Sequence, residues 1–301
     1  ILDSGIQQNH PDINQVPGQD FTGSGAVGGG PFNVCDNHGT TVAGCVSAII
    51  NNSIGTVGVA PGVKSASAKV TISNLNCSGS GGTYSITWHN DALNWAFNAG
   101  FRVSNASFGV GPSSLVQGAY LGTRNTGLGM VHFASTGNEG VDGIRFPGSS
   151  NGVNGVGATN RFGTRAGFSN YGFGTDFVAP GEAVYTCDRT GADGYVFGDY
   201  INTEGTSYSS PYAAGVAALV ISNNPGFTAA QVETRMANTA FDMGTPGYDD
   251  FHGWGQVNAY AAMTGVAAPP PPAPGPFNLQ YPPNNSTIQD TAPTFNWTDS
   301  N

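Results

Sequence analysis

The chain has 301 residues, of which 9% are charged, and 46 are glycine. Acidic residues number 19 against 9 basic ones, so the formal net charge is −10, and no basic patch is available to bind the phosphates of a nucleic acid. No apolar run approaches the roughly 18 residues that a membrane-spanning helix needs. The length allows one large domain, or one large domain and a fragment.

Short apolar runs alternate with helical patterns along the first half of the chain. Strands are expected at residues 65–70, 102–106, 129–135 and 153–158. Helices are expected at residues 39–50, 84–99 and 115–126. This alternation predicts a three-layer α/β/α fold, in which helices cover both faces of a mostly parallel sheet. The functional site of such a sheet lies at the carboxyl ends of its strands.

The second half of the chain ends in a change of composition. Helices are expected at residues 208–223, 228–239 (with Thr228 as N-cap) and 256–263. These segments complete a first domain at residues 1–265. Residues 266–276 are rich in proline, which predicts an extended linker. Residues 277–301 resemble the first strands of a fibronectin type III-like or other β-sandwich module, truncated before it could bury a core.

The four cysteines are Cys35, Cys45, Cys77 and Cys187. No pair has the C-x-x-C spacing of a zinc site or a thioredoxin-like centre. An even number favours two disulfides and an oxidising compartment. Four buried free thiols are the alternative, and the sequence leaves it open.

Three segments carry side chains that suit acyl transfer. Ser207 stands in GTSYSSPYAAGVAALV, where a hydroxyl-rich turn precedes a helix, either as a helix cap or as a nucleophile. His38 begins a helix in DNHGTTVAG and could act as its base, whereas His132 lies in an apolar strand and is expected to be a core histidine. Asp3 ends an apolar strand in LDSGI, where a carboxylate could orient the imidazole.

The order Asp, His, Ser and the surrounding segments resemble the subtilisin-like serine peptidases, or subtilases. The resemblance extends from Ile1 to about Met263. It is carried by LDSGI with HPDI, HGTTVAG, NNSIGTVGVAP, SNASFG, ASTGNEG, FPGSSNGVNGVGAT, FSNYG with FVAPG, GTSYSSPYAAGVAAL and GWGQVNA. In this family tens of mature residues precede the catalytic Asp, so we expect the N-terminus here to be incomplete.

The resemblance implies a role for each candidate. Ser207 would be the nucleophile, His38 the general base and then acid, and Asp3 the orienting carboxylate. The Asn138 side chain and the Ser207 backbone N–H would bind the oxyanion. Pro211 is expected in the first turn of its helix, where a missing N–H has no consequence.

Substrate recognition in this family pairs an extended peptide with exposed backbone segments. The resemblance places these segments at Ser107, Phe108 and Gly109, and at Ser135, Thr136 and Gly137. Tyr84 would cover a pocket for a more distant side chain. Arg145 would lie near the floor of the primary pocket and favour an acidic or polar residue before the cleaved bond, or it would be an ordinary surface arginine.

The resemblance also implies a structural Ca²⁺ and a disulfide. The implied ligands are the side chains of Asp12 and Asn52 and the carbonyls of Ile50, Ile54 and Thr56. A metal-free Asx turn is the alternative. Some subtilases bridge the loop before the histidine to the loop that begins the substrate pocket, which implies Cys35–Cys77 and leaves Cys45 with Cys187.

The sequence therefore predicts a secreted serine endopeptidase that cleaves proteins or peptides through an acyl-enzyme. We expect a monomer that is made with an N-terminal propeptide, needs no organic cofactor, binds no nucleic acid and has no membrane span. A catalytically inactive relative would need a broken triad or oxyanion donor, and all four residues are in place. An α/β-hydrolase esterase would carry its triad in the order Ser, acid, His, whereas the order here is Asp, His, Ser.

Overall fold

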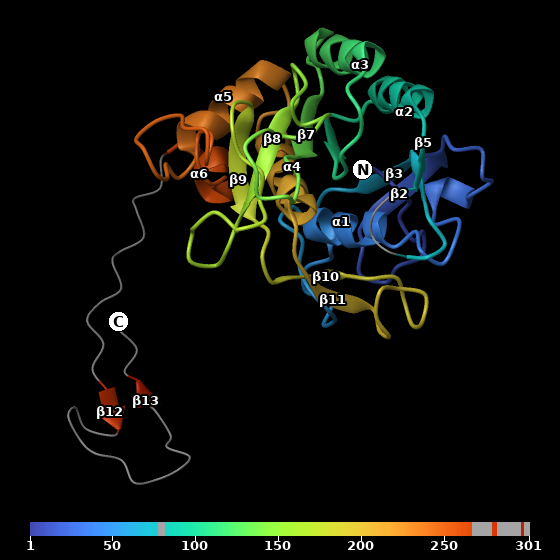
Figure 1. Cartoon of the computed structure of the whole chain (residues 1–301), viewed down its shortest axis with the longest axis horizontal. Helices are drawn as coiled ribbons and strands as arrows, with labels where there is room; N and C mark the ends of the chain where they lie inside the picture. The colour runs from blue at the N-terminus through green and yellow to red at the C-terminus, as the bar shows by residue number, and fades with distance from the viewer. Residues whose placement is uncertain (78–81, 267–278, 282–295, 298–301) are drawn as a thin grey trace. The chain divides into compact units, whose positions relative to one another are not determined.

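A computed structural model describes residues 1–77, 82–266, 279–281 and 296–297. The chain divides into two units, Ile1–Ala267 and Ala268–Asn301. The first contains a sheet of seven parallel strands (Figure 1). In spatial order these are β2 (Gln15–Asp20), β3 (Ser65–Lys69), β1 (Leu2–Asp3), β6 (Val103–Ala106), β7 (Val131–Ser135), β8 (Asn154–Thr159) and β9 (Thr175–Pro180).

Helices cover both faces of this sheet. One face carries α2 (Ile86–Asn98) and α3 (Ser114–Asn125). The other carries α1 (His38–Ser47), α4 (Thr206–Asn223), α5 (Ala229–Thr239) and α6 (Ala259–Thr264). Along β7, Phe133 packs toward α4 and its neighbour Ala134 toward α2 and α3, because successive strand residues point to opposite faces. The predicted three-layer α/β/α fold is confirmed.

The remaining elements are short. They are the 3₁₀ turn η1 (Val27–Gly29), the hairpin β4 (Thr71–Ser73) and β5 (Gly82–Tyr84), and the hairpin β10 (Val184–Cys187) and β11 (Tyr200–Thr203). Tyr84 therefore ends a strand and does not begin a helix, as the sequence had suggested. The Ser85 side chain accepts a hydrogen bond from the Thr87 N–H and caps α2 at the next residue.

The expected helices and strands of the first unit lie within about three residues of their predicted bounds. Helix α4 begins at Thr206, two residues early, so Pro211 lies inside the helix and the expectation of a first-turn proline is wrong. A residue at this position would normally donate its N–H to the carbonyl of Ser207. Since proline has no N–H, that carbonyl is free for another donor.

The second unit is described only at β12 (Leu279–Tyr281) and β13 (Asn296–Trp297), which pair antiparallel. Nearly all of the predicted linker at 266–276 and most of the predicted module at 277–301 lie outside the described residues, so the domain division stays a prediction. Within the described part of the chain, no helix is long and apolar enough to cross a membrane.

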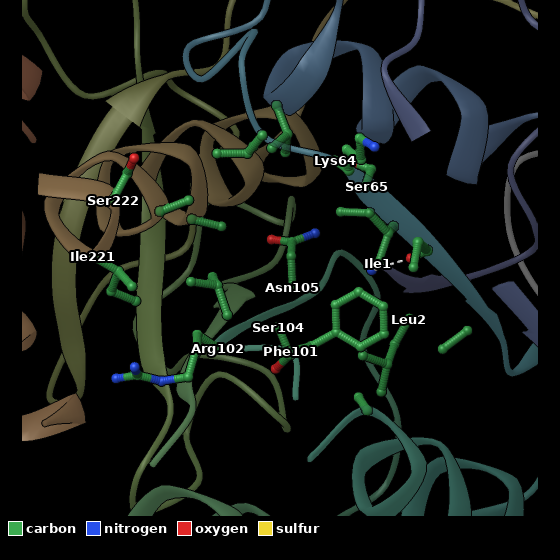
Figure 2. A pocket seen from close by; sticks show the side chains of 18 of the residues that line it. Ile1, Leu2, Lys64, Ser65, Phe101, Arg102, Ser104, Asn105, Ile221 and Ser222 are labelled. Atoms are coloured by element: carbon green, nitrogen blue, oxygen red, sulfur yellow. Dashed lines mark hydrogen bonds between the residues drawn. The ribbon is translucent and has the colours of Figure 1, made fainter. Parts of the chain in front are cut away.

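A mostly apolar pocket of about 300 Å³ lies beside strands β1, β3 and β6 and helices α2 and α4 (Figure 2). The Ile1 amino group borders this pocket and donates to the Ala66 carbonyl at 2.9 Å. Burial lowers the pKa of this amine to about 6, against the opposing charge of Asp3. The Asn105 side chain also lines the pocket; its amide group donates to the Ser107 hydroxyl, and its carbonyl group accepts from the Ser210 hydroxyl of α4.

Candidate active site

A cleft of about 800 Å³ lies at the carboxyl ends of β1, β6 and β7, where the sequence predicted the site. It is lined by all four residues that the sequence assigned to catalysis, Asp3, His38, Asn138 and Ser207. They come from the end of a strand, the start of α1, the loop after β7 and the first turn of α4. Chain topology alone therefore gathers residues up to 204 positions apart in one cleft.

Asp3 and His38 form a hydrogen-bonded pair. The Nδ1 atom of His38 lies 3.0 Å from Oδ1 and 2.9 Å from Oδ2 of Asp3, whose side chain is 4% exposed. Burial alone would lower the pKa of His38, but the charge of Asp3 and its hydrogen bond outweigh burial, so this pKa is raised. A neutral His38 with its proton on Nδ1 faces Asp3 and leaves Nε2 as an acceptor.

Glycine at position 39 allows the start of α1 to lie in direct contact with the backbone that follows β1. A Cβ atom there would lie 2.5 Å from the carbonyl oxygen of Gly5, which is shorter than any tolerable contact. The Gly39 N–H also donates to the hydroxyl of Ser4 at 3.2 Å. The backbone of α1 is thus anchored directly beside Asp3, which fixes the start of the histidine helix.

Ser207 is the second residue of α4, and its hydroxyl faces the backbone of the neighbouring strand end. Its Oγ donates to the Ser107 carbonyl at 3.1 Å, and the Ser107 hydroxyl donates to the Ser207 carbonyl at 2.8 Å. The second bond uses the carbonyl that Pro211 leaves free. Among the described residues no hydrogen bond joins Ser207 to His38. The structure therefore assembles the Asp3–His38 half of the triad and places Ser207 in the same cleft with its proton donated elsewhere.

Asn138 is held by its carbonyl oxygen. Its Oδ1 accepts from the Thr206 N–H at 2.9 Å and from the Thr206 hydroxyl at 2.8 Å, so Nδ2 remains a donor. Gly205, with φ of 142°, lies between this amide and Ser207. A Cβ atom at Gly205 would lie 3.3 Å from Asn138 Nδ2 and 3.7 Å from the Ser207 nitrogen. The two nitrogen donors therefore border one small space that is open because residue 205 is glycine.

Sequence reasoning missed a buried ion pair behind the site. The Lys69 ammonium lies 2.8 Å from Asp36 Oδ2, and both side chains are fully buried. The same ammonium donates to the carbonyls of Ser4 and Thr71. Burial lowers the pKa of Lys69, while Asp36 opposes that effect. A lysine within the small-residue strand SASAK was the one signal that could have revealed it, because a charge in a buried strand needs a partner.

A second missed group is the buried chain that ends at Ser107. The Ser210 hydroxyl donates to Asn105 Oδ1 at 2.6 Å, and Asn105 Nδ2 lies 2.9 Å from the Ser107 hydroxyl. Because Ser107 contacts both the carbonyl and the hydroxyl of Ser207, this chain positions the first turn of α4. The hydroxyl-rich turn of the sequence thus contains one candidate nucleophile and one supporting residue, Ser210.

The two segments expected to pair with a peptide differ in the structure. Among the described residues, the backbone groups of Phe108 and Gly109 have no hydrogen-bond partner. In the segment Ser135–Gly137 the backbone is already bonded: Thr136 bonds to Val156 and Arg145, and Gly137 bonds to Thr206 and Asn170. Because these backbone groups are already paired, the segment borders the cleft without offering them to a peptide. Ser135 and Gly137 line the cleft, and the role of the segment in binding a peptide stays a prediction. The unforeseen candidate is β5, which also lines the cleft and pairs only with β4 in the described structure.

Arg145 lies beside both segments, and its place in the floor of the primary pocket stays a prediction. Its side-chain carbons approach within about 3 Å of where Cβ atoms would stand at Gly109 and Gly137. Its guanidinium lies 3.0 Å from Glu139 Oε1, with both side chains about half exposed. Hydrogen bonding to Glu139 raises the pKa of Arg145, and the same pairing lowers the pKa of Glu139. An acidic substrate residue would have to compete with Glu139.

The loop expected to bind Ca²⁺ is organised around the fully buried Asp12. Its carboxylate accepts hydrogen bonds from the Asn52 amide at 2.5 Å, the Thr56 N–H at 3.2 Å and the Ile49 N–H at 3.3 Å. The described residues include no group of three or more His, Cys, Asp or Glu side chains that could hold a metal. The loop nevertheless supplies oxygen donors of the kind that Ca²⁺ takes, with Asp12 as its one carboxylate.

Cys35 and Cys77 form a disulfide with a Cα–Cα distance of 4.9 Å, as the resemblance implied. The expected Cys45–Cys187 bridge is wrong, because both are buried free thiols. They point into different parts of the core: Cys45 packs with Val184 and Tyr208, and Cys187 packs with a separate cluster around Ile6 and Ala43. Burial raises the pKa of the Cys45 thiol to about 12 and also raises that of Cys187.

Comparison with known proteins gives the same family as the geometry. The sequence profile described as the subtilase family matches residues 1–255. Subtilisin Savinase of Lederbergia lenta is 39% identical over 264 residues, which cover 87% of this chain and 88% of that protein. M-protease of Shouchella clausii is also 39% identical over 264 residues, but the chain spans only 63% of its length. The solved structure of a protease from Pseudoalteromonas arctica matches with a TM-score of 0.73 at 29% identity, covering 88% of each chain. The chain therefore belongs to the subtilase family of serine-type endopeptidases.

Proposed function

We propose that the protein is a serine endopeptidase that uses Asp3, His38 and Ser207 as its triad. The observation that carries this proposal is the pair formed by the buried Asp3 carboxylate and the partly exposed His38 imidazole, at 2.9–3.0 Å, in the cleft that also contains Ser207 and Asn138. Such a pair keeps the imidazole in one tautomer and stabilises it when it takes up a proton. The relatives named above carry the names subtilisin and protease, which supports the same chemistry.

In the proposed mechanism, the Ser207 hydroxyl turns from the Ser107 carbonyl toward His38 Nε2. His38 takes its proton while Oγ attacks the carbonyl carbon of the scissile bond, and Asp3 stabilises the resulting imidazolium. His38 then gives this proton to the leaving amine, which leaves an ester on Ser207. Water attacks the ester, gives its proton to His38, and His38 returns a proton to Ser207 as the acid product departs.

The oxyanion would occupy the space beside Gly205. There it can accept hydrogen bonds from Asn138 Nδ2 and from the Ser207 N–H, which also lies at the positive end of α4. Because Thr206 already holds the other end of the Asn138 amide, little reorganisation is needed when negative charge develops.

An extended peptide would bind between Phe108–Gly109 and β5, pairing its backbone with both. We propose that Arg145 and Glu139 together form the floor of the primary pocket. If Glu139 restrains Arg145, then Glu139→Gln should raise cleavage after acidic residues relative to cleavage after Phe. An unchanged ratio of kcat/KM for Glu- and Phe-containing peptides would show that Arg145 is a surface residue.

A fluorophosphonate probe and casein hydrolysis test the triad together. The probe should label Ser207, and Ser207→Ala should lose labelling and casein cleavage. Ser209→Ala is the matched control, since Ser209 lies two residues further along α4, is buried and donates to the Pro180 carbonyl. Labelling that persists in Ser207→Ala refutes the assignment, and a folded protein that neither labels nor cleaves is the inactive relative.

We also propose that the Asp12 loop can bind Ca²⁺. The ion would be held by the Asp12 carboxylate, the Asn52 amide oxygen and the carbonyls of Ile50, Ile54 and Thr56. It would supply the positive charge that the buried Asp12 carboxylate lacks, since this carboxylate accepts hydrogen bonds only from uncharged N–H groups in the described structure. Added Ca²⁺ should raise the Tm relative to chelator, and Asp12→Asn should abolish this shift. Equal Tm values with Ca²⁺ and chelator would contradict binding.

We propose that the protein acts outside the cell as a monomer, after loss of an N-terminal propeptide. The Cys35–Cys77 disulfide supports an oxidising compartment. Mass spectrometry of the protein from its native host would test this proposal, since it predicts a processed chain with this crosslink in the extracellular fraction. An intact precursor retained in the cell would contradict it.

A further inference from the structure

A cluster of aromatic rings lies beneath one wall of the cleft. Tyr84 and Phe108 line the cleft, and both rings pack on the imidazole of His89, with centroid distances of 5.9 Å and 5.6 Å. On another side, His89 meets the ring of Tyr120 of α3 at 5.4 Å. His89 thus lies between the two rings that line the cleft and the ring of Tyr120 in the interior.

Hydrogen bonds run through the same residues. The Tyr84 hydroxyl lies 3.0 Å from His89 Nδ1, and His89 Nε2 lies 2.7 Å from the Tyr120 hydroxyl. His89 and Tyr120 are fully buried. Burial lowers the pKa of His89 to about 3, so its imidazole is neutral and has one donor and one acceptor nitrogen. Both nitrogens are used, one toward the cleft wall and one toward the interior.

Strand pairing gives this wall little support. Tyr84 ends the three-residue strand β5, whose only strand neighbour in the described structure is the three-residue strand β4. Two-stranded hairpins of this length are marginally stable without packing. The Cys35–Cys77 disulfide tethers the segment between the two strands, and the contacts with His89 and Phe108 hold the Tyr84 ring itself.

We propose that His89 is a positioning residue for substrate recognition. It holds the Tyr84 ring as a wall against which a bulky apolar side chain of an extended peptide packs, away from the scissile bond. The wall residues Tyr84, Phe108 and Val110 present an aromatic and aliphatic surface, which favours an apolar partner. This inference rests on the proposed peptidase function.

The variants separate positioning from folding. Tyr84→Phe removes only the hydroxyl at the cleft. His89→Leu combined with Tyr120→Phe removes the hydrogen bonds while leaving no buried partner unpaired in the interior. His132→Gln is the matched control, because His132 is equally buried, also has a pKa lowered to about 3, and bonds instead to Ser104 and Thr123.

The measurement is kcat/KM for an extended peptide with a bulky apolar residue at the distant position, divided by that for a short ester that does not reach the wall. The ratio should fall about 3- to 10-fold in Tyr84→Phe and in the His89→Leu, Tyr120→Phe variant, mainly through KM. In the His89→Leu background, Tyr84→Phe should have no further effect, because the hydrogen bond is already absent. His132→Gln should keep the parent ratio.

A ratio that stays at the parent value in the His89→Leu, Tyr120→Phe variant overturns the proposal. So does an equal fall in His132→Gln, which would indicate general destabilisation, or full additivity of Tyr84→Phe with His89→Leu. Failure of the peptidase function is distinguishable, because the parent protein would then turn over neither substrate and Ser207 would not react with the fluorophosphonate.

Discussion

The charge of Asp3 governs the chemistry of His38. Desolvation disfavours a positive imidazole, but the carboxylate at 2.9 Å favours it more strongly, and the pKa of His38 is raised. A general base must be neutral to accept a proton, so catalysis should increase as pH rises through this raised pKa. In the proposed mechanism, this one ion pair would therefore set both the orientation of His38 as the base and the lower pH limit of activity.

Replacing Asp3 by Asn should remove the negative charge and keep the shape. The pKa of His38 should fall, since burial is then opposed by no charge, and kcat should drop by about 10⁴-fold because the wrong tautomer is favoured. The pH profile of kcat/KM for a short ester reports both effects, and the acidic limb should move to lower pH. If the acidic side of the profile stays at the same pH, Asp3 does not set the pKa of His38.

The four catalytic candidates could be predicted because each lies in a short motif whose neighbours constrain it, such as Gly39 beside His38. The supporting residues could not be predicted in this way. Lys69 and Asp36 are 33 residues apart, and His89 and Tyr120 are 31 apart, and only the folded chain brings them into contact. A sequence shows that such a side chain is present but not which partner satisfies it.

At the scale of elements, the peptide-binding edges show where local sequence is insufficient. The segment at Ser135–Gly137 contains a glycine and ends a strand, which are the features of an open edge. Its backbone is nevertheless paired by Arg145, Val156 and Asn170, and these bonds come from segments that the sequence did not place beside it. The free thiols of Cys45 and Cys187 have a similar explanation, because spacing does not reveal which way a side chain points.

The Cys35–Cys77 bridge joins the loop before α1 to the segment between β4 and β5, across 42 residues. Cys35→Ser combined with Cys77→Ser should lower the free energy of unfolding by up to about 4 kcal/mol, because the unfolded chain regains the entropy of that loop. Urea denaturation measures the loss. Reducing agent should have the same effect on the parent protein and none on the double variant, and a parent protein insensitive to reduction would contradict the prediction.

For the whole molecule, stability and catalysis should respond to pH in opposite directions. Burial raises the pKa of Asp176 to about 7, and the nearby charge of Glu233 adds to this. The folded state therefore holds a proton that the unfolded state has released, and the stability contribution is lost as pH rises from about 4 to 7. The raised pKa of His38 has the same sign, since the Asp3–His38 ion pair is lost on deprotonation.

We therefore expect the free energy of unfolding to fall between about pH 4 and pH 7 through Asp176, and to fall further, as kcat/KM rises, when pH passes through the raised pKa of His38. Asp176→Asn should flatten the stability profile over that range, because a neutral amide does not titrate. The control is Asp242→Asn, an exposed carboxylate outside the cleft. Urea denaturation at several pH values gives the profile, and an equal slope in parent and Asp176→Asn would exclude Asp176 as its origin.

The architecture of the first unit was accessible from the sequence because strand and helix patterns alternate regularly there. Strands β2, β4, β9, β10 and β11 were not predicted, and Tyr84 of β5 was assigned to a helix, because these strands are identified by the partners they pair with and not by a strong local pattern. The fold could thus be inferred from its repeated units, whereas the short hairpins that border the site required the tertiary structure.

The near absence of lysine has a practical outcome for anyone attaching this protein to a solid support. Of the two lysines in this sequence, Lys69 is buried in the interior against Asp36, whereas Lys64 is exposed. Lys64 directly precedes β3 and therefore lies at the amino ends of the parallel strands, whereas Ser207 lies at their carboxyl ends. Attachment to amine-reactive beads through Lys64 should therefore leave the cleft facing the liquid.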